Sequence, residues 1–329
     1  MKGLIIIPKF YGYENQISFF LEKNHDFKSI IYNESDLVSK SIFYSIVLIF
    51  IEILIFIFGT SKRLLKLYGF FNKYRKSYDS LNLFLNNEIS KLNSKKINKI
   101  IIFKGAGFSI ETLNLIRNKT NLLYLYLWDS QIIYPEIKQT VKFSNKVFTY
   151  DIDDSLNNGW NYKPMFFNGI DKKIKYNSEL YFCSYIAKYS FFRLLFCLKL
   201  IFNNPTKNFY FYFKFPFKIN FNIFSSKLLF NSNTLDFEEV SNIYSNSKFL
   251  LSISEFSNGG FTQRIYDSFF FKKKCIVNHK NNKWNKRILD NLIHYSAIKS
   301  DQSKFVDLNK QFYKDKKIKF WISDFLNQI

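Results

Sequence analysis

Residues 99–129, KIIIFKGAGFSIETLNLIRNKTNLLYLYLWD, contain the pattern that decides the fold. Apolar runs at 99–103 and 122–128 predict two buried strands, and the segment between them predicts a helix. The glycines of the GAG motif allow a sharp turn after the first strand, and Ser109 can cap the helix. A strand, a helix and a second strand in this order predict a parallel sheet covered by helices.

The same alternation continues through the chain. In the first half it predicts further strands at residues 3–7, 27–32 and 146–150, and helices at 15–23 and from Tyr134. In the second half it predicts strands at 180–184, 209–213, 249–254 and 275–278, and helices at 191–201, 237–244 and 262–271. We therefore expect an α/β protein with two Rossmann-like domains, at 1–168 and 169–329, whose sheets face one cleft.

Composition excludes several classes of protein. The chain has 329 residues, is 47% hydrophobic and 20% aromatic, and carries a formal charge of +22, which is typical of a folded basic protein. Three cysteines and three histidines are too few for a disulfide scaffold or a cysteine-rich zinc site, so we expect no metal and a reducing compartment. The apolar run at the amino terminus stops at Pro8 without a cleavage site, which argues against a signal peptide.

Residues 41–58, SIFYSIVLIFIEILIFIF, form the strongest hydrophobic run. If it spanned a bilayer, the first two strands would be separated from their sheet, and Glu52 would cost about 2.5–3.5 kcal/mol. Residues 62–76 then alternate basic and large apolar side chains, as in helices that lie on anionic membranes. We expect a helical insertion at about 38–95 that lies on a membrane surface or packs as a hairpin on the sheet or on a second subunit.

Residues 255–279, EFSNGGFTQRIYDSFFFKKKCIVNH, combine a strand end, a glycine-rich turn and a short helix. Gly259 and Gly260 allow a tight turn, and Thr262 can cap the helix that follows. Arg264 lies in the first turn of this helix. Backbone N–H groups at a helix start, the helix dipole and a guanidinium together form an anion site that suits a diphosphate. An ordinary N-cap turn in an α/β domain is the alternative.

Asp267 follows Arg264 by about one helical turn and can accept hydrogen bonds from a ribose diol. The stretch resembles the nucleotide-sugar signature of GT-B glycosyltransferases, and most closely that of the group-1-like or CgeB-like capsule and lipopolysaccharide transferases. The matching residues are Gly260, Thr262, Arg264, Asp267, Ser268, Phe269, Lys273, Lys274, Ile276 and Asn278. The resemblance implies that Asp267 holds the ribose and that Gly259, Gly260, Thr262 and Arg264 face the phosphates.

The chain departs from this family pattern at two positions. Asp267 replaces the usual glutamate, and the first acid of the wider pattern falls on Gly259, so Glu255 would have to take its role. Similar motifs in the first half, at 103–118, 124–130, 146–154 and 164–167, extend the resemblance over about residues 99–278.

Asp129 and Glu14 are the candidate catalytic residues. Each is expected just beyond the end of an apolar strand, where its carboxylate can act as a base for an acceptor hydroxyl. Asp129 can also serve in an Asx-turn or a helix cap beside Ser130. Asp151, Asp153 and Asp154 resemble a divalent-metal cluster, but we favour a helix start, because acidic side chains suit the positive end of the helix dipole.

With this resemblance, the sequence predicts a glycosyltransferase that moves a sugar from a nucleoside-diphosphate donor to a lipid-linked, lipopolysaccharide or capsule glycan. No cofactor is expected, because helix amides and Arg264 would neutralise the leaving diphosphate. The positive charge would attract both the donor and an anionic membrane surface, which predicts a cytoplasmic enzyme that is peripheral on the inner membrane face.

Two alternatives come from other functional classes. A basic surface with aromatic residues also occurs in nucleic-acid-binding proteins. The aromatic residues of this chain lie within predicted strands, however, and no nucleic-acid recognition motif is present, so nucleic acid is not an expected partner. The second alternative is an inactive GT-B-shaped protein retained for assembly.

Overall fold

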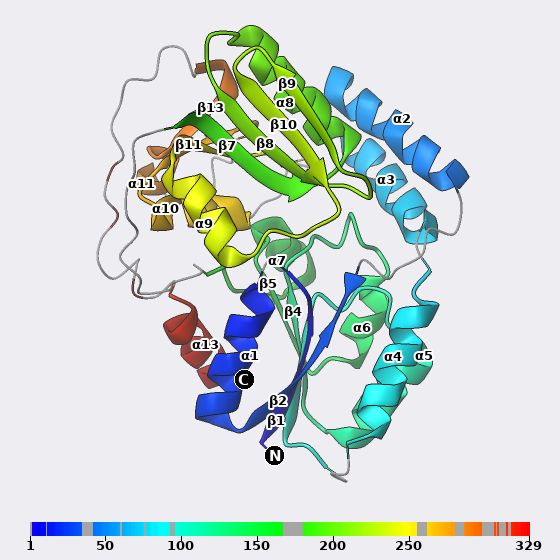
Figure 1. Ribbon diagram of the computed structural model, residues 1–329. Coiled ribbons are helices and arrows are strands. Elements are labelled where there is room, and N and C mark those ends of the chain that lie inside the picture. Colours follow the sequence, from blue (N-terminus) through cyan, green and yellow to red (C-terminus); the bar gives the residue numbers. More distant parts are fainter. Residues whose placement is uncertain are drawn as a thin grey trace. The chain divides into compact units, whose positions relative to one another are not determined.

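The computed structural model describes residues 2–10, 12–34, 42–59, 61–75, 77–92, 96–166, 180–254, 262–279, 286–297, 306, 308, 314 and 317–329. The chain forms two compact units (Figure 1). The first comprises Met1–Pro164 and Ile322–Ile329, and the second comprises Met165–Ser257 and Phe261–Trp321. Residues 168–177, a polar and lysine-rich stretch whose composition predicts a linker, lie outside the described residues.

The first unit contains a six-stranded sheet of order β2-β1-β3-β4-β5-β6, in which all neighbouring strands are parallel. Its strands are β1 Gly3–Pro8, β2 Phe27–Tyr32, β3 Lys99–Phe103, β4 Leu123–Leu127, β5 Lys146–Thr149 and β6 Asn161–Tyr162. Its helices are α1 Tyr13–His25, α2 Ile42–Phe58, α3 Lys62–Arg75, α4 Asp79–Ser90, α5 Ile110–Lys119, α6 Ile137–Phe143 and α7 Ile152–Asn158. The strands predicted near residues 3–7, 27–32, 99–103, 122–128 and 146–150 are therefore present.

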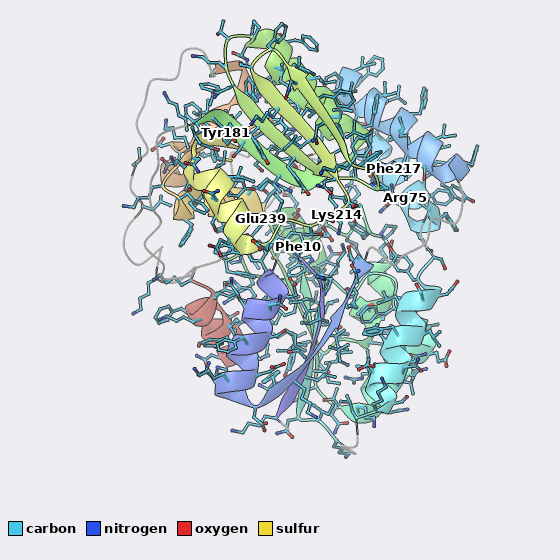
Figure 2. All side chains as sticks on the ribbon, in the orientation of Figure 1. Phe10, Arg75, Tyr181, Lys214, Phe217 and Glu239 are labelled. Carbon is cyan, nitrogen blue, oxygen red and sulfur yellow. The ribbon has the colours of Figure 1, made fainter. Side chains whose placement is uncertain are left out.

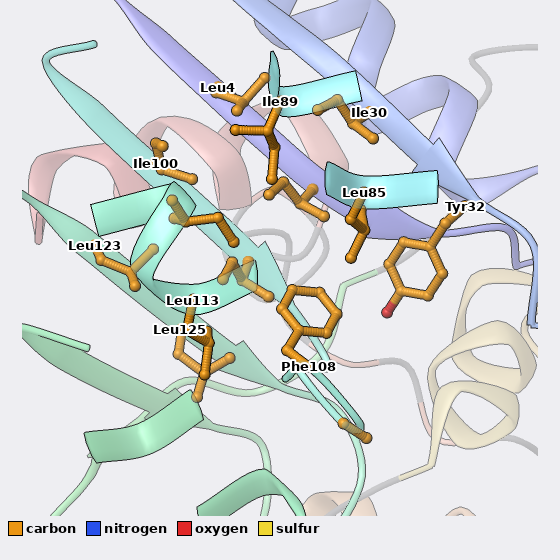
Figure 3. Packing of buried hydrophobic residues seen from close by; sticks show 14 of the residues in the cluster. Leu4, Ile30, Tyr32, Leu85, Ile89, Ile100, Phe108, Leu113, Leu123 and Leu125 are labelled. Atoms are coloured by element: carbon orange, nitrogen blue, oxygen red, sulfur yellow. The ribbon is translucent and has the colours of Figure 1, made fainter. Parts of the chain in front are cut away.

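Helices α4, α5 and α6 contribute to the core on one face of this sheet. Alternate side chains along a strand point to opposite faces, so Leu4 of β1 and Ile100 of β3 join the same cluster. Leu85 from α4 and Leu113 from α5 pack into it and are fully buried (Figure 3). Burial on both faces explains why these strands are continuous apolar runs rather than alternating ones.

The end of the chain returns to the first unit. Helix α13, Ile318–Asn327, brings Phe325 against Phe103, Tyr126 and Phe148, with ring centroids 4.9–6.4 Å apart. Lys163 also forms an ion pair with Asp324. The sequence analysis assigned these last residues to the second domain, because an amphipathic helix at a chain end carries no signal for the sheet that it will cover.

The helical insertion begins with α2 and α3, which pack against each other. Buried Glu52 of α2 accepts a hydrogen bond from the hydroxyl of Tyr68 on α3, at 3.4 Å. The Cβ that any other residue would place at Gly69 of α3 would lie 2.1 Å from the carbonyl oxygen of Ile132, so glycine lets α3 approach that backbone closely. Among the described residues, none of the helices has both the length and the apolar character that crossing a bilayer requires.

The second unit contains a seven-stranded sheet of order β13-β12-β11-β7-β8-β10-β9. Its strands are β7 Tyr181–Lys188, β8 Phe209–Lys214, β9 Ile219–Ile223, β10 Ser226–Asn231, β11 Ser247–Ser252, β12 Lys274–Val277 and β13 Leu292–His294. Its helices are α8 Phe191–Asn203, α9 Phe237–Ser245, α10 Gln263–Phe270, α11 Lys286–Leu289 and the 3-10 turn Tyr295–Ala297. The prediction of a second Rossmann-like sheet is confirmed.

Strands β9 and β10 form an antiparallel hairpin that the sequence analysis did not predict. Strand β9 is an edge strand, and its side chains are mostly exposed. An edge strand without a buried face lacks the apolar pattern by which the inner strands were recognised. The inner strand β10 pairs with β8 in parallel, so the hairpin leaves the parallel centre of the sheet intact.

Candidate functional site

Each sheet has one point at which the strand order reverses. In the first sheet β1 lies between β2 and β3, and in the second β7 lies between β8 and β11. Ligands of open α/β sheets bind at such switch points, outside the carboxyl ends of the strands. Five of the seven site residues predicted from the sequence lie in the described part of the chain, and Gly259 and Gly260 lie outside it.

Helix α10 begins at the switch point of the second sheet. Thr262 is its N-cap residue, but the Thr262 side chain makes no capping hydrogen bond. Its Oγ1 instead lies 2.6 Å from Oγ of Ser252, at the carboxyl end of β11. The predicted cap position is thus correct, while the hydroxyl joins the helix to the strand rather than to the helix amides.

Arg264 joins the same helix to β7, on the other side of the switch point. Its Nε donates to the carbonyl oxygen of Ile186 at 2.7 Å, and its guanidinium lies 4.9 Å from the centroid of the Tyr185 ring. A guanidinium has five N–H donors in a fixed fork, so this anchor at Nε holds the plane of the group at the strand end. The structure thus places a positive charge beside the first turn of α10.

Asp267 is only 7% exposed. Its Oδ1 accepts a hydrogen bond from Nε2 of Gln263 at 3.2 Å, and the same Nε2 donates to the carbonyl oxygen of Phe166 at 2.8 Å. The carboxylate therefore lies beneath the first turn of α10 rather than on its surface.

The second helix at this switch point, α8, is capped by its own residues. Ser190 accepts a hydrogen bond from the amide of Arg193 at 3.2 Å, and Arg193 donates from Nη1 to the carbonyl oxygen of Lys188. Lys188 at the end of β7 is in register with Lys214 at the end of β8. Figure 2 labels Lys214. The carboxyl end of the second sheet is therefore rich in positive charge.

The switch point of the first sheet has a different chemical character. Lys104 follows β3 with a φ of 71°, and Gly105 and Gly107 follow with φ of 68° and 81°. The Cβ of any other residue at Gly107 would lie 2.1 Å from the Tyr78 ring, so the predicted need for glycine in this turn is confirmed. Ser109 caps α5 as predicted and accepts a hydrogen bond from the amide of Thr112 at 3.1 Å.

The Lys104 amine lies between two carboxylates. Its Nζ is 2.8 Å from Oε1 of Glu34, which follows β2, and 2.8 Å from Oδ2 of Asp129, which follows β4. The ring of Tyr134 covers it at 4.7 Å. Burial lowers the pKa of Lys104, but the negative charges of Asp129 and Glu34 raise it by more. The pKa therefore lies well above its usual value, and the amine stays charged.

The position of Lys104 lowers the stability of the folded state in two ways. A non-glycine residue in the left-handed region costs about 1–2 kcal/mol, and a buried charge costs several kcal/mol before its partners compensate. The Lys104 side chain is 8% exposed, while those of Glu34 and Asp129 are 25% and 30% exposed. The cation is thus enclosed, and both carboxylates remain within reach of solvent.

Glu14 lies at the same end of the sheet but is 1% exposed. Its Oε2 accepts a hydrogen bond from the backbone N–H of Phe10 at 2.7 Å, which closes the turn between β1 and α1. Asp151 accepts hydrogen bonds from the amides of Asp153 and Asp154 as the N-cap of α7. The acidic run at 151–154 therefore starts a helix, as predicted.

Lys104 and Glu34 are the residues that the sequence analysis missed. Both are charged residues that come just after an apolar strand, the same signal that identified Asp129. Glu34 and Lys104 are 70 residues apart in the chain, and only the pairing of β2, β1 and β3 brings them together. Taking the first charged residue after every predicted strand would have found both.

No protein-family model and no curated protein sequence matches this chain. The crystal structure of UDP-GlcNAc 2-epimerase from Neisseria meningitidis, bound to UDP-GlcNAc, aligns over 100% of both chains, with a TM-score of 0.51 and 9% identity. A glycosylation-associated protein complex from Streptococcus agalactiae aligns over 77% of this chain and 57% of that chain, with a TM-score of 0.36 and 10% identity. The full-length likeness to the epimerase shows that this chain has a GT-B-type fold.

Proposed function

We propose that this protein is a nucleotide-sugar enzyme of the glycosyltransferase type, which binds a nucleoside-diphosphate sugar through its second unit. The observation that carries the proposal is the start of α10, where Thr262 leaves the helix amides uncapped by a side chain and Arg264 adds a positive charge. A helix N-terminus and a guanidinium together bind diphosphate well, because both supply N–H donors to anionic oxygens. The GT-B-type fold supports the same class.

Within this proposal, Thr262 and Arg264 contact the diphosphate together with Gly259 and Gly260. Asp267 binds the ribose diol, which takes the place of the Gln263 amide as its donor. Asp267→Ala should then weaken UDP binding. Gln263→Ala, which removes the competing donor together with its hydrogen bond to the Phe166 carbonyl oxygen, should not. Equal affinities of wild type and Asp267→Ala would remove Asp267 from the site.

The acceptor glycan is assigned to the first unit, with Asp129 rather than Glu14 as the base. Asp129 is partly exposed, whereas Glu14 is buried and holds the Phe10 amide. A base has to come within hydrogen-bond reach of the hydroxyl that it deprotonates, and Asp129 meets that requirement better. A lipid-linked, lipopolysaccharide or capsule glycan is the proposed acceptor class, and the CgeB-like transferases remain the proposed relatives.

Thermal unfolding with added ligands tests the proposed class. A nucleotide that binds only the folded state stabilises it, by about 2.7 kcal/mol at one hundred times its Kd. We expect UDP, GDP or UDP-GlcNAc to raise the Tm and a short oligonucleotide to leave it unchanged. Stabilisation by the oligonucleotide alone would favour the nucleic-acid-binding alternative. Nucleotide binding without any UDP release from UDP-GlcNAc would favour an inactive assembly protein.

We also propose that α2 and α3 attach the enzyme to the cytoplasmic face of an anionic membrane. Their exposed apolar side chains, here called the α2–α3 apolar face, recur at helical spacing: Phe43, Ile46, Phe50 and Ile57 on α2, and Leu67, Phe70 and Tyr74 on α3. Exposed cations accompany them on α3, namely Lys62, Arg63, Lys66 and Lys73. Apolar side chains beside cations match an anionic lipid surface, to which each cation adds about 1 kcal/mol.

Sedimentation with vesicles tests this attachment. The protein should sediment with vesicles that contain phosphatidylglycerol and much less with phosphatidylcholine alone. Phe50→Ser with Ile57→Ser, or Lys62→Glu with Lys66→Glu, should release it. Leu156→Ser and Lys138→Glu are matched controls at exposed positions outside the α2–α3 apolar face. Dimerisation without vesicle binding would show that a second copy covers this face instead.

A further inference from the structure

Glu34, Lys104 and Asp129 follow three strands of the first sheet in the same way. They come just after β2, β3 and β4, and β1 lies between the first two of these strands. The carboxyl ends of parallel strands meet at one edge of a sheet, so the three side chains converge at its switch point. The ion pairs of Lys104 with both carboxylates show this convergence directly.

Lys104 is an unexpected residue at its position. The backbone there has a φ of 71°, which favours glycine, and glycines do occupy positions 105 and 107 of the same turn. A residue that keeps an unfavourable backbone conformation and a buried charge is retained for its side chain. Its amine makes ion pairs with the two carboxylates, and the Tyr134 ring covers it.

The charges of the cluster do not cancel. One ammonium between two carboxylates leaves one net negative charge, and the exposed parts of the cluster belong to the carboxylates. Oδ2 of Asp129 binds the lysine, and among the described residues no hydrogen bond involves the other oxygen, Oδ1. The cluster therefore presents an ionised carboxylate oxygen at a ligand-binding edge.

We propose that Lys104 is a positioning residue, which binds Oδ2 of the Asp129 carboxylate and so orients Oδ1 to accept the proton of an acceptor hydroxyl. The inference rests on the proposed function. In this step the acceptor oxygen forms a bond to the anomeric carbon of the donor sugar, the bond from that carbon to the diphosphate oxygen breaks, and the hydroxyl proton passes to Asp129. The nucleoside diphosphate leaves with the electron pair of the broken bond.

The first test follows the carboxyl carbon of Asp129 by NMR at neutral pH, with carbon-13 in the aspartate carboxyl groups and Asp129→Asn for assignment. Lys104→Met removes the group that binds Oδ2, so the Asp129 resonance should shift. Lys119→Met should leave this resonance in place.

The second test measures UDP release from UDP-GlcNAc, with water as acceptor. Lys104→Met should lower kcat about tenfold or more and leave KM nearly unchanged. Lys119→Met is the matched control, because Lys119 bonds only the carbonyl oxygen of Leu92 among the described residues. Lys104→Gly suits the backbone conformation and provides a folded variant if methionine disturbs the turn.

A role confined to stability predicts different results. Lys104→Met would then lower the Tm while the Asp129 resonance and kcat stay unchanged. An unchanged resonance or an unchanged kcat in Lys104→Met would overturn the proposal. If the wild type does not bind UDP, the donor site of the second unit is overturned instead. The NMR measurement does not depend on that site, so the two failures can be told apart.

Discussion

The carboxyl edges of the two sheets share a topology but differ in charge. At the first edge Lys104 is enclosed by Glu34 and Asp129, which leaves a net negative cluster. At the second edge Lys188, Lys214 and Arg264 lie at or beside the ends of β7 and β8 and at the start of α10. The proposed diphosphate site lies at the second edge, and the proposed base lies at the first. Two similar sheets thus have carboxyl edges of opposite charge.

Helix capping differs between the two edges as well. Ser109 fills the N-cap of α5 with a side-chain hydrogen bond, whereas Thr262 binds Ser252 and leaves α10 without such a cap. A side-chain cap satisfies one of the orphan amides at a helix start, and without it that amide is left for water or an anion. The difference in capping agrees with the difference in charge.

The largest expected effect comes from Asp129→Asn. The substitution replaces the carboxylate by an amide and so removes the base. The rate of UDP release from UDP-GlcNAc should therefore fall by about 10²–10⁴-fold, while the Kd for UDP stays the same. Asp79→Asn is a control on an exposed aspartate that bonds Ser77 in the same unit. A parallel loss of UDP binding would mean that the two edges are not separate in function.

Asp151 should make the first unit sensitive to pH. Burial, and then the charge of Asp154, raise the pKa of Asp151 to about 6, above the value near 4 of an unfolded chain. The folded state then holds the proton more tightly, so the free energy of unfolding should fall by about 2 kcal/mol as pH rises from 4 to 6.

Asp151→Asn keeps the oxygen that caps α7 but cannot ionise. Urea unfolding at several pH values should show that the variant lacks this part of the pH dependence. Wild type and variant with parallel stability curves between pH 4 and pH 7 would contradict the prediction, because the difference between the curves isolates the Asp151 carboxyl from all other groups.

Arg264→Ala should weaken UDP binding by about 10–100-fold, the usual effect of losing a charge-assisted hydrogen-bond donor. Arg117→Ala is the matched control, because Arg117 also donates to a backbone carbonyl, that of Asn121, but lies in the first unit. Calorimetric titration with UDP checks both variants. Equal losses in the two would point to general charge attraction rather than to a site.

The smallest expected effect is on helix capping. Ser109→Ala should lower the free energy of unfolding by about 1 kcal/mol, because it removes the acceptor for the Thr112 amide. Thr262→Ala removes no cap from α10, so its effect should come only from the lost contact with Ser252. Urea unfolding of both variants, with and without UDP, would show whether ligand binding depends on Thr262 but not on Ser109.

Much of the fold could be predicted because the apolar runs of the inner strands are long and are separated by clear turns. The strands at residues 27–32 and 99–103 and the cap at Ser109 were predicted correctly. The hairpin of β9 and β10 and the return of Phe325 to the first sheet were not. An exposed edge strand and a terminal helix owe their positions to distant partners, and local periodicity carries no information about those.

Prediction of the candidate sites was less complete. The sequence placed Arg264 in the first turn of a helix and Asp129 just after a strand, and the structure agrees on both positions. It did not show that Asp267 would be buried under Gln263, nor that Lys104 would lie between two carboxylates. Side-chain burial and ion pairs depend on which elements pack together, so they could not be derived from spacing along the chain.

The sequence alone determined the order of strands and helices, the glycine turn after β3 and the basic character of the chain, because each depends on neighbouring residues. Only the tertiary structure decided that Glu34, Lys104 and Asp129 form one cluster. Strand pairing brings their strand ends to one edge of the sheet, and burial there turns three ordinary charges into a strongly coupled group. The charge contrast between the two edges is therefore a property of the fold.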